Sequence, residues 1–244
     1  MLAEIGIKGQ IKLARSSVLV IGTGGLGSPA LMYLAGAGVG RIRIVDSDKV
    51  ELSNLHRQVI FDEGDIGRLK AVAASKHLLK KNSLIKTEYS VQRVGGENAP
   101  ALVRGFDAVM DCSDNFETRV LLNEACVAAG ICYFYGSVYE FEGQASVFHA
   151  ATGPCFNCLF PCLPPEKQRQ QLARDGVFGP AAGFIGMVMA AECVKYLLGL
   201  KSVLRGGLLL ADLLNHYYEV VKTVKNPGCP VCGREDGHPN NKIK

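Results

Sequence analysis

One segment, residues 17–46, constrains the fold of this chain more than any other. An apolar β-branched run, SVLVI at 17–21, leads into the glycine-rich turn GTGGLG at 22–27, and the helical pattern that follows closes at Gly38. A second apolar run, RIRIV at 41–45, ends on Asp46. A strand, a glycine turn, a helix and a strand ending in an acid form the phosphate-binding half of a doubly wound fold. The sequence therefore predicts an α/β, Rossmann-like sheet that binds a nucleotide.

Weaker strand and helix patterns alternate beyond this unit. We expect helices over 66–80, 99–104 and 116–129, and strands over 86–94, 106–112, 131–138 and 143–149. The alternation implies a mostly parallel sheet, and the two closely spaced strands at 131–149 indicate an antiparallel edge.

The character of the chain changes after residue 148. Residues 153–179 are rich in Cys, Pro and charge without a clear period, which is typical of a long functional loop. An apolar helix over 179–199 and a hairpin of strands over 208–214 and 217–223 follow, then a polar tail. We predict a single domain over residues 1–244. Its nucleotide-binding half is 1–150, and 151–244 supplies the crossover loop, the long helix, the hairpin and a metal-bound tail.

Composition excludes several classes of protein. Hydrophobic residues make up 48% of the chain and the formal net charge is +4, which does not fit a disordered protein, and no dense basic block indicates nucleic-acid binding. The most apolar stretch, 179–191, has thirteen residues, fewer than the roughly 20 that span a bilayer, so we interpret it as part of a buried helix. Charges within residues 1–16 argue against a secretory signal. We expect a cytoplasmic protein with reduced thiols that binds neither nucleic acid nor membrane.

The glycine turn predicts a phosphate site. Backbone amides at the start of a helix bind phosphate, and Gly22, Gly24 and Gly27 have the dinucleotide spacing. Gly25 removes one more side chain, so that a phosphate can approach the backbone. Asp46 lies 19 residues after Gly27, where a carboxylate accepts hydrogen bonds from ribose hydroxyls. The alternative is that the glycines serve only helix–strand packing, and the motif alone does not distinguish NAD from ATP.

Cations downstream favour ATP. Residues 53–58 (SNLHRQ) contain Asn54 and Arg57, and Lys70 opens the next helical pattern. An enzyme that splits ATP needs positive charge beside the leaving pyrophosphate, whereas hydride transfer has no evident need for it. Taken singly, these cations are also typical of a solvated surface.

A cluster of acids follows the strand predicted at 106–112. Asp114 lies at the carboxyl end of that strand, where such sheets bind ligands, and could hold Mg²⁺ against the phosphates. Asp111 is closer to the strand and is expected to orient the turn. Asn115 either contributes to the site or simply caps the following helix.

Nine cysteines include two CxxC pairs, Cys155 with Cys158 and Cys229 with Cys232. Four thiolates match the tetrahedral preference of Zn²⁺. One pair alone would equally suit a redox motif, but two pairs in a cytosolic chain predict a structural zinc that staples the C-terminal tail to the loop after the sheet. A full set of four ligands leaves no open position for catalysis.

The other five thiols fall into two groups. Cys126, Cys132 and Cys193 lie in apolar patterns and are expected to pack in the core. Cys112, near the presumed nucleotide, and Cys162, in the irregular loop, are left open.

With these residues in view, the sequence resembles the sulfur-carrier-protein adenylyltransferases. These are the MoeB/ThiF/HesA-type enzymes of molybdopterin and thiamine biosynthesis, relatives of ubiquitin-activating enzymes. The resemblance covers about residues 4–233. It rests on the segments GTGGLG at 22–27, AGVG at 37–40, DSD at 46–48, SNLHRQ at 53–58, Lys70, DCSDN at 111–115, EGQ at 142–144 and the two CxxC pairs.

The resemblance implies a role for each matching residue. Gly25 contacts the phosphates, Asp46 binds the ribose, and Asp114 is the Mg²⁺ ligand. Asn54, Arg57 and Lys70 bind and polarise the triphosphate of ATP. The implied nucleotide-binding set is Gly22, Gly24, Gly25, Gly27, Asp46, Asp48, Asn54, Arg57, Lys70, Asp114 and Asn115, of which Arg57, Lys70 and Asp114 are catalytic.

The resemblance also implies a reaction and partners. The C-terminal glycine carboxylate of a small ubiquitin-like carrier protein ending in Gly-Gly attacks the α-phosphate, pyrophosphate leaves, and an acyl-adenylate remains. The family is typically homodimeric.

Two departures qualify this expectation. Family members usually carry an N-terminal Arg-Tyr-x-Arg-Gln segment, whereas this sequence begins at Met1 just after where that segment would lie, so that cation is either lost or supplied from elsewhere. Many members also place a sulfur-transfer Cys where this chain has Leu172, and Cys162 is the candidate substitute. We therefore expect an enzyme that stops at the acyl-adenylate.

Two alternatives remain open on the sequence. One is an NAD-dependent oxidoreductase, although none of the five histidines lies in a recognisable acid–base constellation. The other is a nucleotide-binding scaffold, inactive because the arginine segment is missing. The carrier and its pathway (molybdopterin, thiamine, cysteine or tRNA thiolation) are not specified by the sequence.

Overall fold

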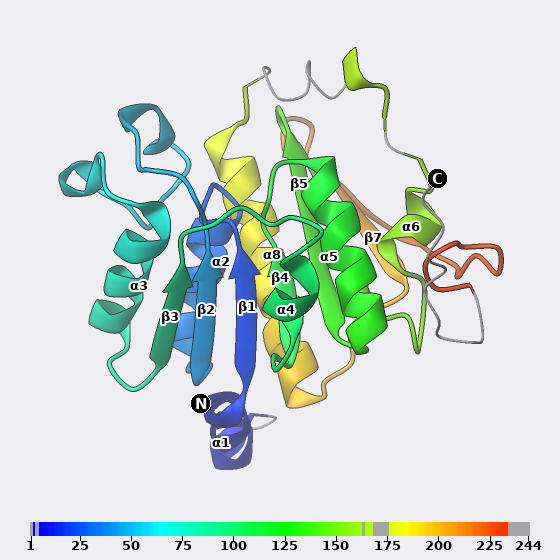
Figure 1. Ribbon diagram of the computed structural model, residues 1–244, viewed down its shortest axis with the longest axis horizontal. Coiled ribbons are helices and arrows are strands. Elements are labelled where there is room, and N and C mark those ends of the chain that lie inside the picture. Colours follow the sequence, from blue (N-terminus) through cyan, green and yellow to red (C-terminus); the bar gives the residue numbers. More distant parts are fainter. Residues whose placement is uncertain (1, 3–4, 163, 168–175, 234–244) are drawn as a thin grey trace.

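The fold is built on a single mixed β-sheet (Figure 1). The computed structural model describes residues 2, 5–162, 164–167 and 176–233. In these residues the strand order is β3-β2-β1-β4-β5-β6-β7-β8. The strands are β1 (Ser17–Ile21), β2 (Arg41–Val45), β3 (Lys86–Ser90), β4 (Ala108–Asp111), β5 (Cys132–Tyr139), β6 (Glu142–Phe148), β7 (Gly207–Asp212) and β8 (Tyr217–Lys222).

The first five strands are parallel and the last three continue the sheet in antiparallel fashion. This confirms the predicted fold class. The sequence suggested that the antiparallel pair β5–β6 lies at an edge of the sheet. The structure places it inside the sheet, because the second edge of β6 pairs with β7. The predicted C-terminal hairpin therefore joins the same sheet, with β8 as its last strand.

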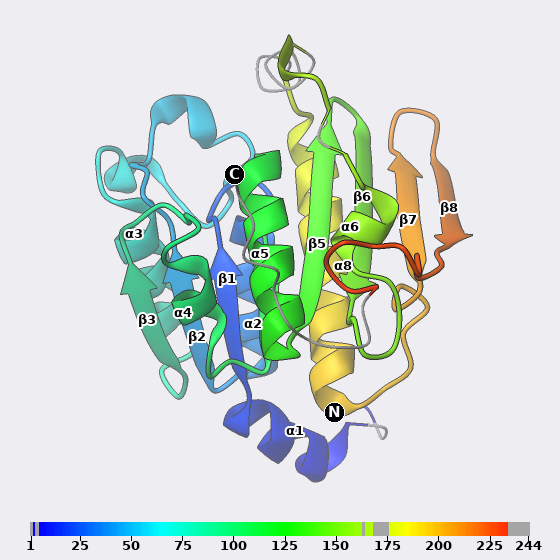
Figure 2. The ribbon, with the colours of Figure 1, turned by 45° about the vertical axis from the view of Figure 1, so that its right-hand side comes forward.

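Helices cover both faces of the sheet (Figure 2). One face carries α2 (Gly27–Ala37), α3 (Lys70–Lys81) and α8 (Gly179–Leu198), and the other carries α4 (Ala99–Val103), α5 (Phe116–Ala129) and α6 (Phe156–Leu159). Helix α1 (Gly6–Arg15), which the sequence did not predict, lies below the amino ends of the parallel strands in Figure 1.

Alternating side chains of β1 explain the two layers. Val18 and Val20 enter the core beneath α2 and α8, whereas Leu19 and Ile21 enter the core beneath α4 and α5. A central parallel strand is buried on both faces, which is why its sequence is a continuous apolar run.

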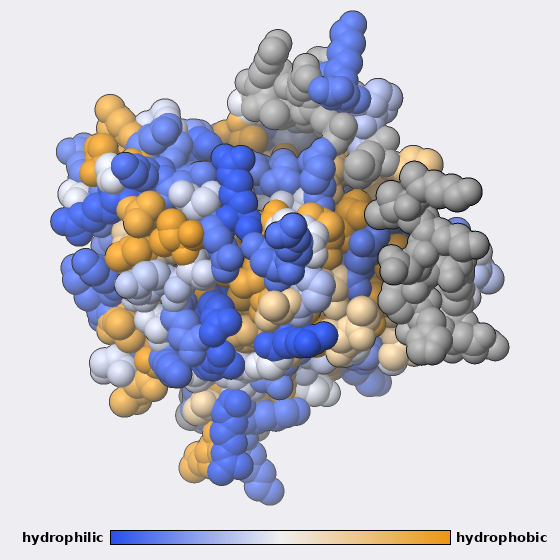
Figure 3. Space-filling view, in the orientation of Figure 1, coloured by the Kyte–Doolittle hydropathy of each residue, from blue (hydrophilic) through white to orange (hydrophobic). Residues whose placement is uncertain are grey.

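Hydrophilic side chains cover much of the face toward the viewer in Figure 3, with hydrophobic residues scattered among them.

Helix α8 is longer than its apolar centre indicated. It has 20 residues and a hydropathy that would allow it to cross a membrane by length and composition, so the sequence argument from thirteen apolar residues does not by itself exclude a span. Half of its most apolar window is buried inside the fold, where the helix packs on α2, β5 and β6. It is the core helix that the sequence predicted.

A charged cluster joins β2 to β3. Glu88 lies 3.0 Å from Arg41 Nε, 2.5 Å from Arg43 Nη2 and 3.1 Å from Lys86 Nζ, and its side chain is 19% exposed. Arg41 is the main cause of the low pKa of Glu88, which falls from 4.5 to about 2. Because the pKa is lowered in the folded state, this carboxylate stabilises the fold above pH 4.5, and the contribution disappears as the pH falls toward 2.

Replacing Glu88 with glutamine should therefore lower the free energy of unfolding at pH 7 by about 2 kcal/mol, after a discount for solvent screening of the arginines. The difference between variant and wild type should shrink as the pH is lowered from 4.5 to about 2. Urea unfolding of both proteins across this range measures it. A difference that stays constant over the range would contradict the assignment.

Candidate functional site

The glycine turn lies between β1 and α2 at the carboxyl edge of the parallel strands. Packing excludes a side chain at three of its glycines, Gly22, Gly25 and Gly27. Gly22 has φ +89, and a Cβ there would lie 2.7 Å from the Cys112 carbonyl oxygen. A Cβ on Gly27 would lie 2.1 Å from the Gly22 carbonyl oxygen. The packing alternative thus holds for Gly22 and Gly27, which meet backbone atoms, and in part for Gly25, which meets the Ala182 side chain at 2.9 Å. Gly24 has only Gln58 Nε2, at 3.9 Å, near its Cβ position.

Asp46 holds the turn in place. Its Oδ2 accepts hydrogen bonds from the backbone N and the Oγ1 of Thr23, at 2.8 and 2.7 Å, and its Oδ1 accepts one from the backbone N of Asp48 at 2.9 Å. Thr23 was not singled out from the sequence. A carboxylate has about four lone-pair sites, so Asp46 still has capacity for a ligand hydroxyl.

The loop after β2 lies against this turn. The stem of Arg57 is 3.5 Å from the Cβ position of Gly25, and Arg57 Nη1 contacts the Ser53 carbonyl oxygen at 3.3 Å and His56 Nε2 at 2.7 Å. Asn54 is buried in the same loop. Gln58 is 3% exposed, and its Oε1 has no hydrogen-bond partner among the described residues. A buried acceptor without a partner costs about 1–3 kcal/mol, so we expect water or a ligand to bind this oxygen.

Lys70 is the first residue of α3 and is nearly buried. Its side chain is 8% exposed, and Nζ lies 3.3 Å from Asp48 Oδ2, whose side chain is 58% exposed. The backbone N of Lys70 donates to the Asp48 carbonyl oxygen at 2.9 Å. Because its ion-pair partner is exposed to solvent, the buried Lys70 ammonium can still interact with a third charged group.

The acids after β4 have separate roles. Asp111 is fully buried, accepts hydrogen bonds from Tyr133 Oη at 2.5 Å and from the backbone N of Ser113 at 2.9 Å, and so orients the turn as expected. Burial raises the pKa of Asp111, and the Arg119 charge opposes that shift. Asn115 accepts from the backbone N of Thr118 at 2.9 Å, so it caps α5.

Asp114 is exposed between these residues. Within the described part of the chain it forms no hydrogen bond or ion pair, so its carboxylate is free for a cation.

Arg119 is a buried cation that sequence reasoning missed. It is 4% exposed, and its Nη2 donates to the Ser113 carbonyl oxygen at 3.3 Å and to Ser137 Oγ at 3.1 Å. Its guanidinium lies 5.0 Å from the ring centre of Phe116 and 5.4 Å from that of Tyr135. An arginine in an amphipathic helix reads as a surface residue, so nothing in the sequence indicated this position.

A groove of about 380 Å³ lies over the antiparallel strands near this cation. Ser137, which binds Arg119, is part of its lining, as are Gln144 from β6 and Tyr217 from β8. Ser137 thus connects this groove to the buried guanidinium of Arg119, which also binds the Ser113 carbonyl oxygen.

The start of α8 closes the other side of the site. Ala182 Cβ would be 2.9 Å from a Cβ on Gly25, and a Cβ on Gly179 would be 2.6 Å from the His56 carbonyl oxygen. The structure thus brings the glycine turn, the loop of Arg57, and Lys70 with Asp48 together through direct contacts. The turn also touches the Cys112–Ser113 backbone that leads to Asp114.

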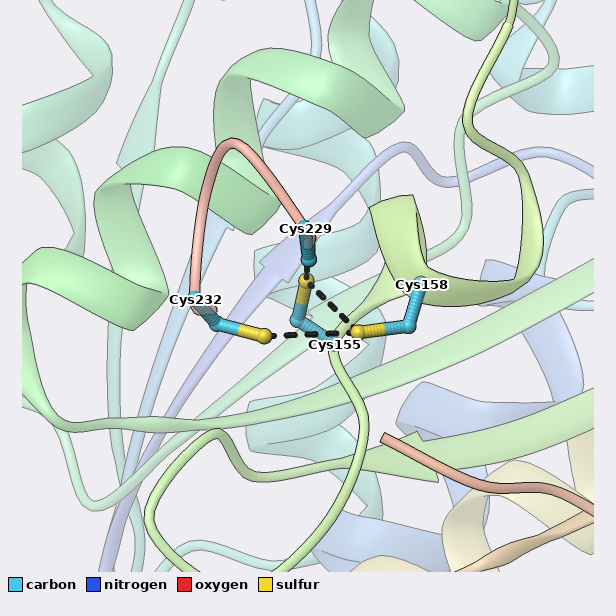
Figure 4. Close-up of side chains that lie close together, drawn as sticks. All are labelled: Cys155, Cys158, Cys229 and Cys232. Atoms are coloured by element: carbon cyan, nitrogen blue, oxygen red, sulfur yellow. Dashed lines mark hydrogen bonds between the residues drawn. The ribbon is translucent and has the colours of Figure 1, made fainter. Parts of the chain in front are cut away.

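The four cysteines of the two CxxC pairs converge (Figure 4). The Sγ–Sγ distances are 3.9 Å from Cys155 to Cys158, 3.6 Å from Cys155 to Cys229 and 3.3 Å from Cys158 to Cys232. Four thiolates about 2.3 Å from a tetrahedral Zn²⁺ lie about 3.8 Å apart, so these residues fit that metal. The backbone N of Asn226 donates to Cys158 Sγ at 3.4 Å, a contact typical of metal thiolates.

The remaining thiols are less suited to chemistry. Cys126, Cys132 and Cys193 are buried as predicted, and burial raises the pKa of each, that of Cys132 to about 12. Cys112 is also buried with a raised pKa, so it is not a ready nucleophile. Cys162 is exposed, and Leu172 lies outside the described residues.

Sequence comparisons give the chain clear relatives. The model of the ThiF family matches residues 1–231. The chain is 46% identical over 240 residues to the sulfur carrier protein adenylyltransferase of Thermus thermophilus, covering 96% of this chain and 89% of that protein. It is 43% identical over 230 residues to the SAMP-activating enzyme E1 of Haloferax volcanii, covering 94% and 85%.

Longer relatives match over part of their length. The chain is 43% identical to the adenylyltransferase and sulfurtransferase MOCS3 of Mus musculus, covering 96% of this chain and 51% of that protein. The chain thus spans about half the length of such relatives.

Among solved structures, Escherichia coli MccB with ATP superposes with a TM-score of 0.83 at 23% identity, covering 92% of this chain and 68% of that one. PaaA gives 0.75 at 20% identity, covering 89% and 67%. At this identity the likeness shows the fold alone.

Proposed function

Because the chain belongs to the ThiF family, we infer that it catalyses the ATP-dependent adenylation of the C-terminal glycine carboxylate of a small ubiquitin-like sulfur carrier protein. The products are an acyl-adenylate and pyrophosphate. The observation that carries this inference is the 46% identity to a sulfur carrier protein adenylyltransferase over nearly the full length of both proteins. The relatives give no support to the oxidoreductase alternative.

We propose that the triphosphate lies across the glycine turn. Free amides at the start of α2 and the positive end of its dipole favour phosphate there. In this proposal Arg57 and Lys70 flank the phosphates. Arg57 packs on Gly25 of the turn, and Lys70 is paired with Asp48, whose backbone N donates to Asp46. Negative charge moves toward the β-phosphate as pyrophosphate leaves. Two cations held beside that charge stabilise the transition state more than the ground state.

The nucleophile needs no base. A C-terminal carboxyl with a pKa of about 3.5 is ionised at neutral pH, so it can attack the α-phosphorus directly. The new carboxyl-oxygen–phosphorus bond forms as the bond from the α-phosphorus to the bridging oxygen breaks, and pyrophosphate takes the electron pair. We therefore assign no acid–base role to His56, whose Nε2 contacts Arg57 Nη1 at 2.7 Å.

Asp114 is the proposed ligand for Mg²⁺. Its exposed carboxylate, which has no partner among the described residues, supplies the hard oxygen that this ion prefers. When bound, the ion would neutralise phosphate charge. Asp111 and Arg119 hold the Asp114 loop from beneath through Ser113.

The proposed zinc is structural. Four sulfur ligands fill a tetrahedral site and leave no position for substrate. Reduced metal-bound thiols suit a cytoplasmic protein, and we propose that the enzyme acts there as a homodimer.

ATP–pyrophosphate exchange tests the proposed function. The carrier is a ubiquitin-like protein ending in Gly-Gly from the same genome, and the control is that carrier without its last two residues. Exchange of radiolabelled pyrophosphate into ATP should require the intact carrier, and replacing Asp114 with alanine should abolish it. Nucleotide binding without exchange by the wild type would instead favour the inactive scaffold.

A further inference from the structure

The loop between β2 and α3 carries much of the proposed nucleotide site without regular strands or long helices. It contains Asp48, Asn54 and Arg57 and ends at Lys70, yet residues 46–69 form only two short 3-10 turns, Leu52–Asn54 and Glu63–Asp65. Other contacts must fix the positions of these side chains.

One set of contacts joins the two ends of the loop. Val50 N donates to the Arg68 carbonyl oxygen at 2.9 Å, and Gly67 N donates to the Val50 carbonyl oxygen at 2.8 Å. Together with the bond from Lys70 N to Asp48, they form a short ladder. Whatever fixes residues 65–68 therefore also fixes the chain that enters Leu52–Asn54.

Asp65 fixes that segment to α3. It is 3% exposed, and its Oδ2 lies 2.6 Å from His77 Nε2 and accepts from Asp62 N at 3.3 Å. Burial opposes ionisation of Asp65, but the hydrogen bonds from His77 and Asp62 outweigh it, so the pKa of Asp65 is below its ordinary value. The group is a carboxylate, and His77 Nε2 must be the donor. Arg68 N in turn donates to the Asp65 carbonyl oxygen at 2.9 Å.

The same three side chains are not arranged as a metal site. Ligand atoms of Asp62, Asp65 and His77 lie within 4.8 Å of one another. The Asp65 and His77 atoms are directly hydrogen-bonded, however, and Asp62 Oδ1 accepts from Gly64 N at 2.8 Å. These groups already satisfy each other.

We propose that the Asp65–His77 pair is a positioning brace for the nucleotide site, a role that rests on the proposed function. His77 follows Lys70 by seven residues, about two turns, so both lie on one side of α3. The brace holds the 62–68 segment on the helix that bears Lys70, and the ladder passes this constraint to the loop that bears Asn54 and Arg57.

Loosening the brace lowers the fraction of molecules whose loop is ready to bind. The apparent affinity for ATP falls in proportion to that fraction. Once ATP is bound, the loop is already ordered, so the rate of the chemical step does not change. The signature is a higher KM for ATP with kcat nearly unchanged.

Two variants of the whole chain test this. His77→Ala removes the donor to Asp65, and His77→Gln keeps an amide donor at similar reach. We expect His77→Ala to raise the KM and the Kd for Mg-ATP about tenfold, with kcat within twofold, and His77→Gln to restore most of the loss. The Kd from calorimetry does not need a carrier, so it tests the brace even if exchange, and with it the proposed function, fails.

The matched control is Glu192→Gln. Glu192 is also buried and bound to Lys195 and Ser202, but it lies thirteen residues along α8 from Gly179, roughly 20 Å from the site. It should lower the Tm without changing ATP affinity. An unchanged Kd in His77→Ala, or an equal loss in His77→Ala and His77→Gln, would overturn the brace, and a wild type that binds no ATP would overturn both proposals.

Discussion

Replacing Lys70 with methionine should lower the kcat/KM of ATP–pyrophosphate exchange by about 10²–10³-fold, the effect expected when one preorganised charge is removed from a transition state. The methionine stem can fill the same nearly buried space, and the only ion pair lost in the described structure is to the solvated Asp48. The Tm should therefore fall little. ATP–pyrophosphate exchange assays with the intact carrier measure the loss of activity, and thermal unfolding measures the loss of stability.

The matched control is Lys76→Met on the exposed face of the same helix. It removes an equal charge and should keep exchange within about twofold of wild type, because a solvated charge contributes little. If both substitutions have the same effect, Lys70 does not act at the reaction and the charge argument fails.

Removing the metal from the cysteine cluster should have the largest effect on stability. Cys155 and Cys229 are 74 residues apart, and a cross-link closing such a loop stabilises a protein by about 4 kcal/mol on the chain-entropy estimate. We expect Cys229→Ser, or chelation of the wild type, to remove one equivalent of zinc and a similar free energy of unfolding. Metal analysis and urea unfolding measure the two quantities.

Cys162→Ser is the control for this experiment, because Cys162 is exposed and outside the cluster. It should retain zinc and full stability. A wild type without bound zinc, together with an undiminished stability of Cys229→Ser, would show that the four cysteines do not form a structural metal site.

The sequence predicted the helices and strands whose bounds are set by neighbouring residues. The bounds of β1, β2 and α5 agree with the expected ranges because apolar β-branched runs and an Asn cap define them without help from distant residues. Helix α3 begins at Lys70 and not at Ile66, since the segment before it forms a separate turn closed by Asp62 and Asp65.

Contacts between distant residues could not be predicted in this way. The bond from Thr23 to Asp46, the buried Arg119 beneath the Asp114 loop, and the Asp65–His77 brace each depend on how strands and helices pack. The four-cysteine cluster is the exception. Its two CxxC pairs predict a shared metal site even though Cys155 and Cys229 are 74 residues apart. The family resemblance and the fold are confirmed, whereas the single-domain division and the roles of individual nucleotide-site residues remain predictions.

The most direct test of the central claim is the intact mass of the carrier protein after incubation with this enzyme, Mg-ATP and pyrophosphatase. Adenylation predicts that the carrier gains the mass of one adenylyl group at its C-terminal glycine, and that the carrier without its Gly-Gly gains nothing. A carrier of unchanged mass, under conditions in which the enzyme binds ATP, would contradict the proposed function.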